Sequence, residues 1–227
     1  MITAFLPCRA GSKRVPNKNT KPFGAYEGGL LELKLRHLVD TPSIDRIFVS
    51  SNDQKVLDYA TAFSATVAKP FEIVRRPEEL SVDDCLDALI GYVGQQIPEG
   101  EVLWTHVTSP LFDAACYQEF IESYLAAKKN DQCDSALTVD EHQTFVYRRG
   151  QVDSHDPSVK KWPRTQDLEP YFLVNSAAFI IPGELMRSMN DRVGHKPYLY
   201  VTPQLKGYDV DIQAQFDVAQ TLVAAGF

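Results

Sequence analysis

The sequence predicts an α/β fold in which helices cover both faces of a mostly parallel sheet. In the first half of the chain, short apolar runs alternate with longer segments that carry apolar residues at helical spacing. This alternation is typical of parallel strands joined by crossover helices. The length of 227 residues and the hydrophobic fraction of 44% suffice for one domain with a real core. We expect a single domain over residues 1–227, with an inserted segment around residues 140–170.

The expected elements of the first half follow one another in the order of such a fold. Residues 2–6 are apolar and end at Pro7, which indicates a buried strand. Residues 30–39 repeat leucine and valine at helical spacing, which indicates a helix. Further strands are expected over 46–50, 65–68 and 101–107, and further helices over 53–63, 83–96 and 114–128, with Ser51 or Asn52 as the cap of the helix at 53–63.

The second half of the chain has a different pattern. Strands are expected over 135–139, 144–149 and 171–181, with Arg149-Gly150 as a turn. Residues 152–168 are polar and rich in Pro, Lys, Asp and Arg, which indicates an excursion from the sheet. The last expected elements are a short strand at 208–211 and a helix over about 212–225.

Composition excludes several classes of protein. The 23 Lys and Arg residues against 30 Asp and Glu residues give a net charge of −7, whereas nucleic-acid binders usually have a basic excess. The four cysteines are scattered and form no CxxC pair, which argues against a zinc site or a disulfide framework. No apolar run approaches the roughly 20 residues of a membrane span, and the N-terminal segment does not resemble a secretory signal. We therefore expect a cytoplasmic protein that binds neither nucleic acid nor membrane.

A basic loop directly follows the first expected strand. Residues 9–21, RAGSKRVPNKNTK, contain five cations. In an open α/β sheet, ligands bind beyond the carboxyl ends of the strands, where backbone N–H groups and cationic side chains can hold several phosphates. Neither GxxxxGK[ST] nor GxGxxG occurs, so the loop is not one of those two phosphate motifs. The alternative is a solvated surface loop, and the position after the strand favours a phosphate site.

Two carboxylates near the end of the chain suggest a metal site. Asp209 and Asp211 flank Val210, and in a strand their side chains would share a face. Mg²⁺ prefers a few carboxylates together with phosphate oxygens and water. The alternative is a surface pair before a helix, with Asp211 as the N-cap.

Three other segments contain candidate ligand contacts. Arg76 is either a site residue or a surface arginine paired with Glu78 or Glu79. Thr108 ends the strand expected over 101–107, at the edge where ligands bind, although a Ser-Pro turn is equally natural there. Asn175 lies in an apolar strand, where a buried amide needs hydrogen-bond partners that a ligand could supply.

These motifs resemble, in order along the chain, those of the acylneuraminate cytidylyltransferases, which are also called CMP-sialic acid synthetases. The pattern Pro-x-Arg-x-Gly-Ser-Lys-x-x-x-x-Lys-Asn over residues 7–19 resembles the N-terminal signature of that family. Later segments resemble its Arg-Pro-x-x-Leu, Thr-Ser-Pro, Asn-Gly-Ala and Asp-x-Asp motifs; they are residues 76–80, 108–110, 175–177 and 209–211.

The resemblance implies a fold and a reaction. The fold would be a three-layer, Rossmann-like nucleotidyltransferase fold with a small dimerisation excursion, and the protein would be a homodimer. The reaction would be the Mg²⁺-dependent transfer of CMP from CTP to the anomeric hydroxyl of a nine-carbon 2-keto sugar acid of the sialic acid type, with release of pyrophosphate. CTP and an acidic sugar would be the partners, and no general base is evident.

The resemblance also implies roles for individual residues. Catalytic roles fall to Arg9, Lys18 and Asp211. Nucleotide contacts fall to Ala10, Gly11, Ser12, Lys13, Asn19 and Arg76. Sugar contacts fall to His106, Thr108, Ser109 and Asn175, with His106 at a position where the family usually carries Gln. Metal ligation falls to Asp209 and Asp211.

Two departures from the family pattern leave alternatives open. Leu173 stands where relatives specific for sialic acid often have Arg, and Ser176 stands where the family has Gly. The acceptor could therefore be another acidic sugar, such as pseudaminic, legionaminic or 3-deoxy-octulosonic acid. A non-catalytic nucleotide-binding homologue is a further alternative, whereas the lack of a Walker motif disfavours a P-loop kinase.

Overall fold

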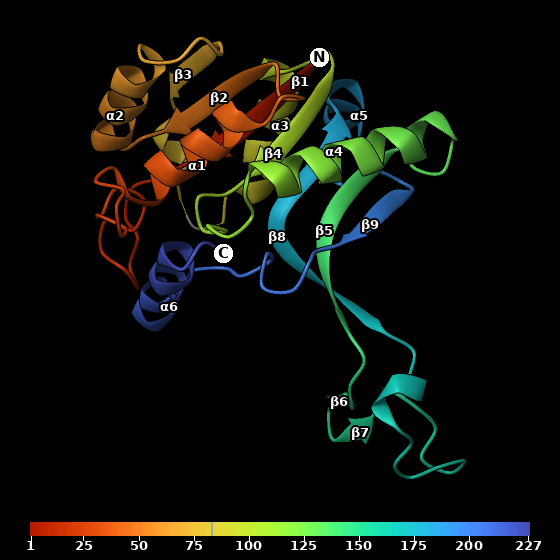
Figure 1. Cartoon of the computed structure of the whole chain (residues 1–227). Coiled ribbons are helices and arrows are strands. Elements are labelled where there is room, and N and C mark those ends of the chain that lie inside the picture. The colour runs from red at the N-terminus through yellow and green to blue at the C-terminus, as the bar shows by residue number, and fades with distance from the viewer. Residues whose placement is uncertain (83) are drawn as a thin grey trace.

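A seven-stranded sheet forms the centre of the computed structural model, which describes residues 1–82 and 84–227 (Figure 1). In spatial order the strands are β3 (Phe71–Arg75), β2 (Arg46–Ser51), β1 (Ile2–Pro7), β4 (Glu101–Thr105), β8 (Tyr171–Pro182), β5 (Ser135–His142) and β9 (Pro197–Val201). β8 runs antiparallel to both of its neighbours, and the other pairs in the sheet are parallel. The predicted mostly parallel sheet is thus confirmed.

Helices cover both faces of this sheet, which confirms the three-layer α/β prediction. The helices are α1 (Gly29–Asp40), α2 (Gln54–Ser64), α3 (Leu86–Gln96), α4 (Ala114–Lys129), α5 (Gly183–Met189) and α6 (Gln213–Ala224). Side chains alternate between the faces of a strand. In β1, Ala4 and Leu6 join the core cluster that includes α1 and α4, whereas Phe5 joins the cluster that includes α3 and α5. In the described residues, no helix combines the length and the apolar character needed to cross a membrane.

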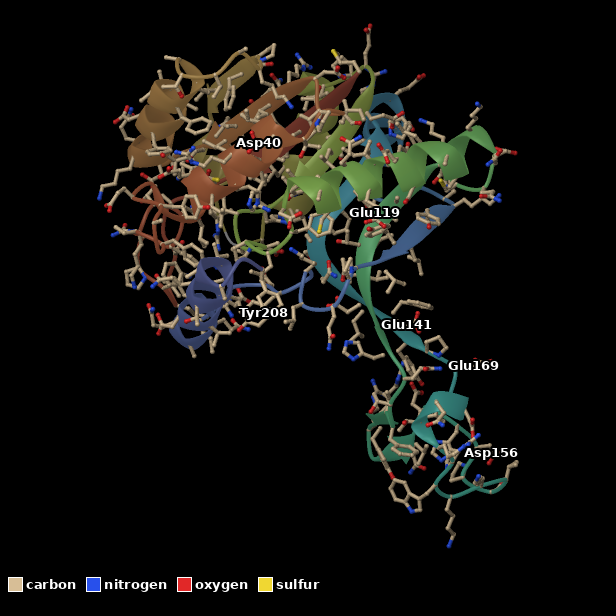
Figure 2. All side chains as sticks on the ribbon, in the orientation of Figure 1. Asp40, Glu119, Glu141, Asp156, Glu169 and Tyr208 are labelled. Carbon is tan, nitrogen blue, oxygen red and sulfur yellow. The ribbon has the colours of Figure 1, made fainter. Side chains whose placement is uncertain are left out.

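An arm projects from the sheet where β5 and β8 run beyond their neighbours (Figure 1). Its hairpin joins β6 (Tyr147–Arg148) to β7 (Gln151–Val152), with left-handed backbone at Arg149 and Gly150, as the predicted turn requires. The strand predicted over 144–149 is therefore limited to two residues. Figure 2 shows Glu141 and Glu169 along the arm and Asp156 near its end.

Other predictions for the first half were wrong in detail. The strand expected over 65–68 is a loop, and the strand lies at β3, where residues 71–75 pair with β2. Asp53 caps α2, because its carboxylate accepts from the backbone N–H of Lys55 at 3.0 Å. The helix expected over 83–96 begins at Leu86, and Asp83 lies outside the described residues.

The C-terminal segment also differs from the prediction. Residues 208–211 do not form a strand, and their backbone is held at Val210, whose N–H donates to the carbonyl of Thr108 at 2.8 Å. Asp211 does not cap α6; the side chain of Gln215 accepts from the N–H groups of Asp211 and Ile212. α5 and β9 were not predicted.

Candidate functional site

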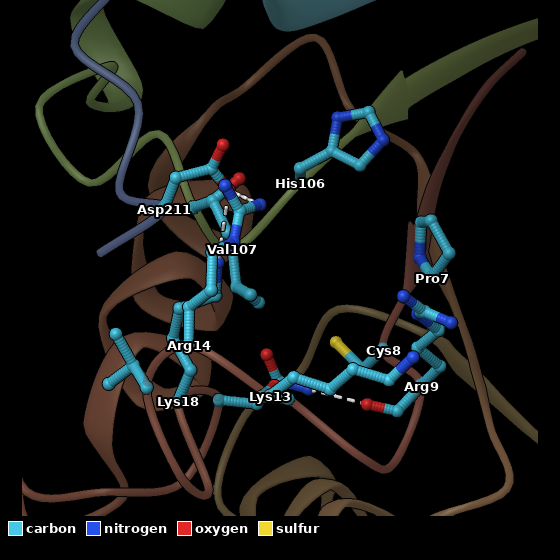
Figure 3. A pocket seen from close by; sticks show the side chains of 13 residues that line it. Pro7, Cys8, Arg9, Lys13, Arg14, Lys18, His106, Val107 and Asp211 are labelled. Carbon is cyan, nitrogen blue, oxygen red and sulfur yellow. Dashed lines mark hydrogen bonds and ion pairs between the residues drawn. The ribbon is translucent and has the colours of Figure 1, made fainter. Parts of the chain in front are cut away.

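A cavity of about 480 Å³ lies beyond the carboxyl ends of β1 and β4 (Figure 3). It is the position at which open α/β sheets bind ligands. The lining residues are contributed by the basic loop, the end of β4 and the segment before α6; they are Pro7, Cys8, Arg9, Ser12, Lys13, Arg14, Val15, Lys18, Asn19, His106, Val107, Thr108 and Asp211. Five of these lining residues were not among the predicted site residues; they are Pro7, Cys8, Arg14, Val15 and Val107.

The basic loop is fixed at several points to the strands beside it. The N–H of Ala10 donates to the side-chain oxygen of Asn52 at 2.9 Å, and the buried Asn19 amide donates to the carbonyl of Arg9 at 3.1 Å. Gly11 has a φ of +80°, which a residue with a Cβ rarely adopts. The loop can therefore turn away from β1 and return to α1 without leaving the mouth of the cavity.

Lys18 joins this loop to the two carboxylates. Its ammonium donates to the carbonyl of Val210 at 2.6 Å and lies 3.6 Å from an Asp211 carboxylate oxygen. Arg14 approaches the same oxygen at 2.8 Å. In Figure 3, Arg14, Lys18 and Asp211 lie together on one side of the cavity. The structure thus places Lys18 and Arg14 beside the Asp211 carboxylate, a contact that the sequence did not predict.

Burial shifts the pKa values of this cluster in a way that favours a bound cation. It lowers the pKa of Lys18, and it raises the pKa of Asp209, with the nearby Asp211 charge adding to the latter shift. The Thr108 side chain partly opposes the shift through a hydrogen bond to the Asp209 carboxylate. A divalent ion would stabilise the charged form of the Asp209 carboxylate. The described residues contain no cluster of three or more metal-ligating side chains, so an ion here would need phosphate oxygens or water besides Asp209 and Asp211.

His106 forms part of the cavity wall, and both of its ring nitrogens are engaged. The indole N–H of Trp104 donates to Nε2 at 3.0 Å, so the proton resides on Nδ1, which donates to the carbonyl of Ser176 at 2.9 Å. Burial lowers the pKa of His106 to about 4. The imidazole is therefore neutral near pH 7 and holds Ser176, whose φ of +60° is one that the family's glycine adopts more easily.

Folding stability is expected to fall as the pH is lowered from 6.5 towards 4. The unfolded chain binds a proton at His106 near pH 6.5, whereas the folded chain resists protonation until about pH 4. The stability from neutral His106 is thus complete above pH 6.5 and is lost below it, by at most about 3 kcal/mol. Buried His37, whose pKa is lowered to about 3, acts in the same direction. Urea unfolding between pH 7 and 4 should show a shallower loss in His106→Gln; equal losses in both proteins would contradict the assignment.

Arg76 is neither on the surface nor in the lining of the cavity. Its side chain is 3% exposed and donates to the carbonyl of Ser50 at 2.6 Å and to the Ser50 hydroxyl at 3.2 Å. It also donates to the carbonyl of Leu80 at 3.4 Å. The predicted alternative of a surface pair with Glu78 or Glu79 was wrong, because the guanidinium holds the end of β2 instead.

Asn175 and Ser109 are buried and do not line the cavity. The Asn175 amide donates to Asp140 and to Thr202, both at 3.0 Å, and its oxygen accepts from the N–H of Ala177 at 3.2 Å. The expectation that a ligand supplies its partners was therefore wrong. Ser109 is fully buried, and its hydroxyl has no hydrogen-bond partner among the described residues. Ala10, Gly11 and Asp209 likewise do not line the cavity.

A family model described as cytidylyltransferase matches residues 3–173, which is most of the chain. The chain belongs to the cytidylyltransferase family. Curated relatives of this cytidylyltransferase chain include N-acylneuraminate cytidylyltransferase A of Danio rerio, 25% identical over 98% of the chain and 50% of the relative. An N-acylneuraminate cytidylyltransferase of Streptococcus agalactiae is 26% identical over 93% of the chain and 51% of the relative. The chain thus spans about half the length of the curated relatives it matches.

Solved structures of similar fold support the same architecture. A CMP:2-keto-3-deoxy-manno-octonic acid synthetase complexed with CTP superposes with a TM-score of 0.67 over 100% of this cytidylyltransferase chain and 99% of that chain, at 12% identity. The 4-diphosphocytidyl-2C-methyl-D-erythritol synthase of Anaerococcus prevotii has a TM-score of 0.65 over 98% of both chains, at 14% identity. At these identities the likeness shows the fold alone, and it confirms the predicted nucleotidyltransferase fold.

Proposed function

We propose that the protein transfers CMP from CTP to the anomeric hydroxyl of a nine-carbon 2-keto sugar acid of the sialic acid type and releases pyrophosphate. The observation that carries this proposal is the cavity in which the cations of the basic loop face the Asp211 carboxylate. A triphosphate needs such a concentration of positive charge in a protein of net charge −7. The family match and the names of the curated relatives support the choice of nucleotide and acceptor.

Catalysis in this proposal is positioning and charge stabilisation. The acceptor hydroxyl attacks the α-phosphorus in line, and pyrophosphate leaves. Arg9 and Lys13, which line the cavity, bind the phosphates and stabilise the charge that develops on the leaving group. The backbone N–H groups of Ser12 and Lys13, which line the cavity, can add dipoles for the same oxygens, whereas the N–H of Ala10 already donates to Asn52.

The carboxylates fit a magnesium site. Asp209 and Asp211 flank Val210, whose backbone is fixed by two hydrogen bonds. Its N–H donates to Thr108, and its carbonyl accepts from Lys18. Bound Mg²⁺ would neutralise phosphate charge there. Lys18 balances the negative charge of the two carboxylates. Arg14 can leave its ion pair with Asp211 and bind a phosphate oxygen instead.

The sugar is proposed to bind beside His106 and Thr108, next to the phosphates. Asn175 supports this region indirectly, since its amide connects β8 with Asp140 and Thr202. One observation favours another acidic sugar as the acceptor: Leu173 is 55% exposed and offers no cation for a carboxylate. Pseudaminic, legionaminic and 3-deoxy-octulosonic acids are therefore the second candidates.

Pyrophosphate release tests the reaction directly. The assay combines the protein with CTP, Mg²⁺ and a panel of eight- and nine-carbon 2-keto sugar acids, with ATP, GTP and UTP as nucleotide controls. Release with CTP and one acid supports the reaction and names the acceptor. Release with another nucleotide, or tight CTP binding without release for any acid in the panel, contradicts the proposal.

We also infer that two copies of the chain associate through exposed apolar side chains of β8 and β9. Val139 pairs with Val174 on one side and Val201 on the other, so these side chains share a face. Val174 is 54% exposed and Val201 42%, and Leu199 on the same face is also exposed. Such an apolar surface is typical of an interface between subunits.

Val201→Glu is expected to convert a dimer into monomers, because it places a charge in the centre of that surface. Sedimentation equilibrium measures the mass of the wild type and the variant. Val218→Glu is the control, since Val218 is equally exposed but lies on α6. A wild type with the mass of one chain, or a variant that remains dimeric, would contradict the interface.

A further inference from the structure

Lys34 is a lysine without exposed surface, which is rare for this residue type. It lies in α1, and its ammonium donates to the carbonyls of Ser109 at 2.9 Å and Phe112 at 3.1 Å and to the Tyr117 hydroxyl at 2.8 Å. No ion pair of Lys34 with a carboxylate occurs among the described residues. Its charge is therefore stabilised by oxygen dipoles of the turn after β4 and of α4.

A count of hydrogens shows that Lys34 needs all three of its protons. The hydroxyl of Thr105 donates its only hydrogen to the carbonyl of Ala177 at 2.8 Å. Its contact with Tyr117 must then be one in which the tyrosine donates. The Tyr117 oxygen is left as an acceptor for Lys34, so the three bonds of Lys34 require an ammonium rather than a neutral amine.

The turn that Lys34 holds is connected to the carboxyl pair. The preceding residue, Thr108, accepts from the N–H of Val210 at 2.8 Å and hydrogen-bonds the Asp209 carboxylate through its side chain. Lys34 therefore fixes Ser109 and Phe112, these fix Thr108, and Thr108 fixes the peptide between Asp209 and Asp211.

We infer that Lys34 is a positioning residue for the Asp209–Asp211 pair, which it orders through the turn at residues 108–112 without touching the cavity. The inference rests on the proposed function for the role of the carboxylates. The link between Lys34 and the segment at 208–211 does not depend on it.

The energetic cost of Lys34 supports a functional reason for its presence. Burial lowers its pKa to about 7, and Cys116 and Asp113 oppose that shift only in part. The ring of Tyr117 also belongs to its surroundings, as does His37, whose Nδ1 has no hydrogen-bond partner among the described residues. An apolar residue of the same length would avoid this penalty, so packing alone does not explain a lysine here.

The test compares Lys34→Met with Lys69→Met by hydrogen exchange and by activity. Lys69 is a matched control, because it also donates to two backbone carbonyls of the α1 region, those of Leu38 at 3.1 Å and Thr41 at 2.6 Å, but near the other end of the helix. In Lys34→Met, amide exchange in peptides covering 108–113 and 208–212 should be at least about tenfold faster, as expected for the loss of a hydrogen bond to a charged group. Lys69→Met should leave both peptides unchanged.

The activity measurement separates positioning from general destabilisation. Lys34→Met should lose about 10- to 100-fold in kcat/KM and need more Mg²⁺ for half-maximal rate, as supporting residues of metal sites do. Lys69→Met should keep both values. If Lys34→Met does not fold, Tyr117→Phe replaces it and should accelerate exchange in the same two peptides. Unchanged exchange at 208–212 in a folded variant overturns the inference, whereas an inactive wild type with accelerated exchange in the variant overturns only the proposed function.

Discussion

Asp211→Ala is expected to abolish pyrophosphate release while the fold stays intact. Asp211 is the carboxylate that lines the cavity, and it contacts Arg14 and Lys18. Its removal takes away a proposed Mg²⁺ ligand and leaves two cations without their shared partner. The loss should be about 10³-fold or more, because metal and charge stabilisation fail together. Single-turnover release of pyrophosphate measures the effect, and circular dichroism checks the fold.

A control in the next helix makes the Asp211 result specific. Asp217 accepts a hydrogen bond from Gln213 on the exposed side of α6, so Asp217→Ala changes the charge by the same amount outside the cavity. It should keep the wild-type rate. A folded Asp211→Ala variant with the wild-type rate would show that this carboxylate takes no part in the reaction.

Lys18→Ala is expected to lose about 10²-fold or more in kcat/KM, comparable to removing one preorganised charge donor. Lys18 crosses from the basic loop to the carbonyl of Val210 and to Asp211, so the variant loses both the cation and the connection between two parts of the site. Initial rates over a range of CTP concentrations give kcat/KM and measure the first effect. The Mg²⁺ concentration needed for half-maximal rate should rise as a consequence of the second.

Lys21 provides the matched control for Lys18. It belongs to the same loop, but its ammonium donates to Gln213 and lies over the ring of Phe216, outside the cavity lining. Lys21→Ala should therefore change kcat/KM by less than about threefold, in the range of a weak exposed contact. A loss below threefold in Lys18→Ala would remove Lys18 from the site.

Local pattern was sufficient to predict most of the fold. β1 and β2 are continuous apolar runs, because both of their faces are buried, and α1 repeats its leucines at helical spacing. β3 was misplaced because it is only partly buried, so its five residues lack a strong apolar signal. α5 and β9 are short and depend on packing against α3 and β5, which no local pattern reports.

Sequence reasoning predicted those site residues whose position follows from the order of strands and loops along the chain. Arg9 and Lys18 lie in the loop after β1, and the topology brings that loop to the ligand-binding edge. The direction of a long side chain is set by tertiary contacts. The residues next to Arg76 in the sequence therefore could not predict that its side chain points towards Ser50. Nothing in the sequence around Lys34 indicates that this lysine of α1 is buried. The cytoplasmic location and the lack of a nucleic-acid partner stay predictions.

The two tryptophans of the chain lie in very different surroundings. Trp104 is 1% exposed and bonded to His106 in the cavity wall, whereas Trp162 is 65% exposed and stacks edge-on with Phe145 in the arm. Their fluorescence should therefore separate by wavelength, with Trp104 emitting to the blue of Trp162. Emission at the red edge reports on the arm, and quenching of the blue component reports on occupancy of the cavity. The fold thus contains two independent optical reporters, one beside the cavity and one in the arm.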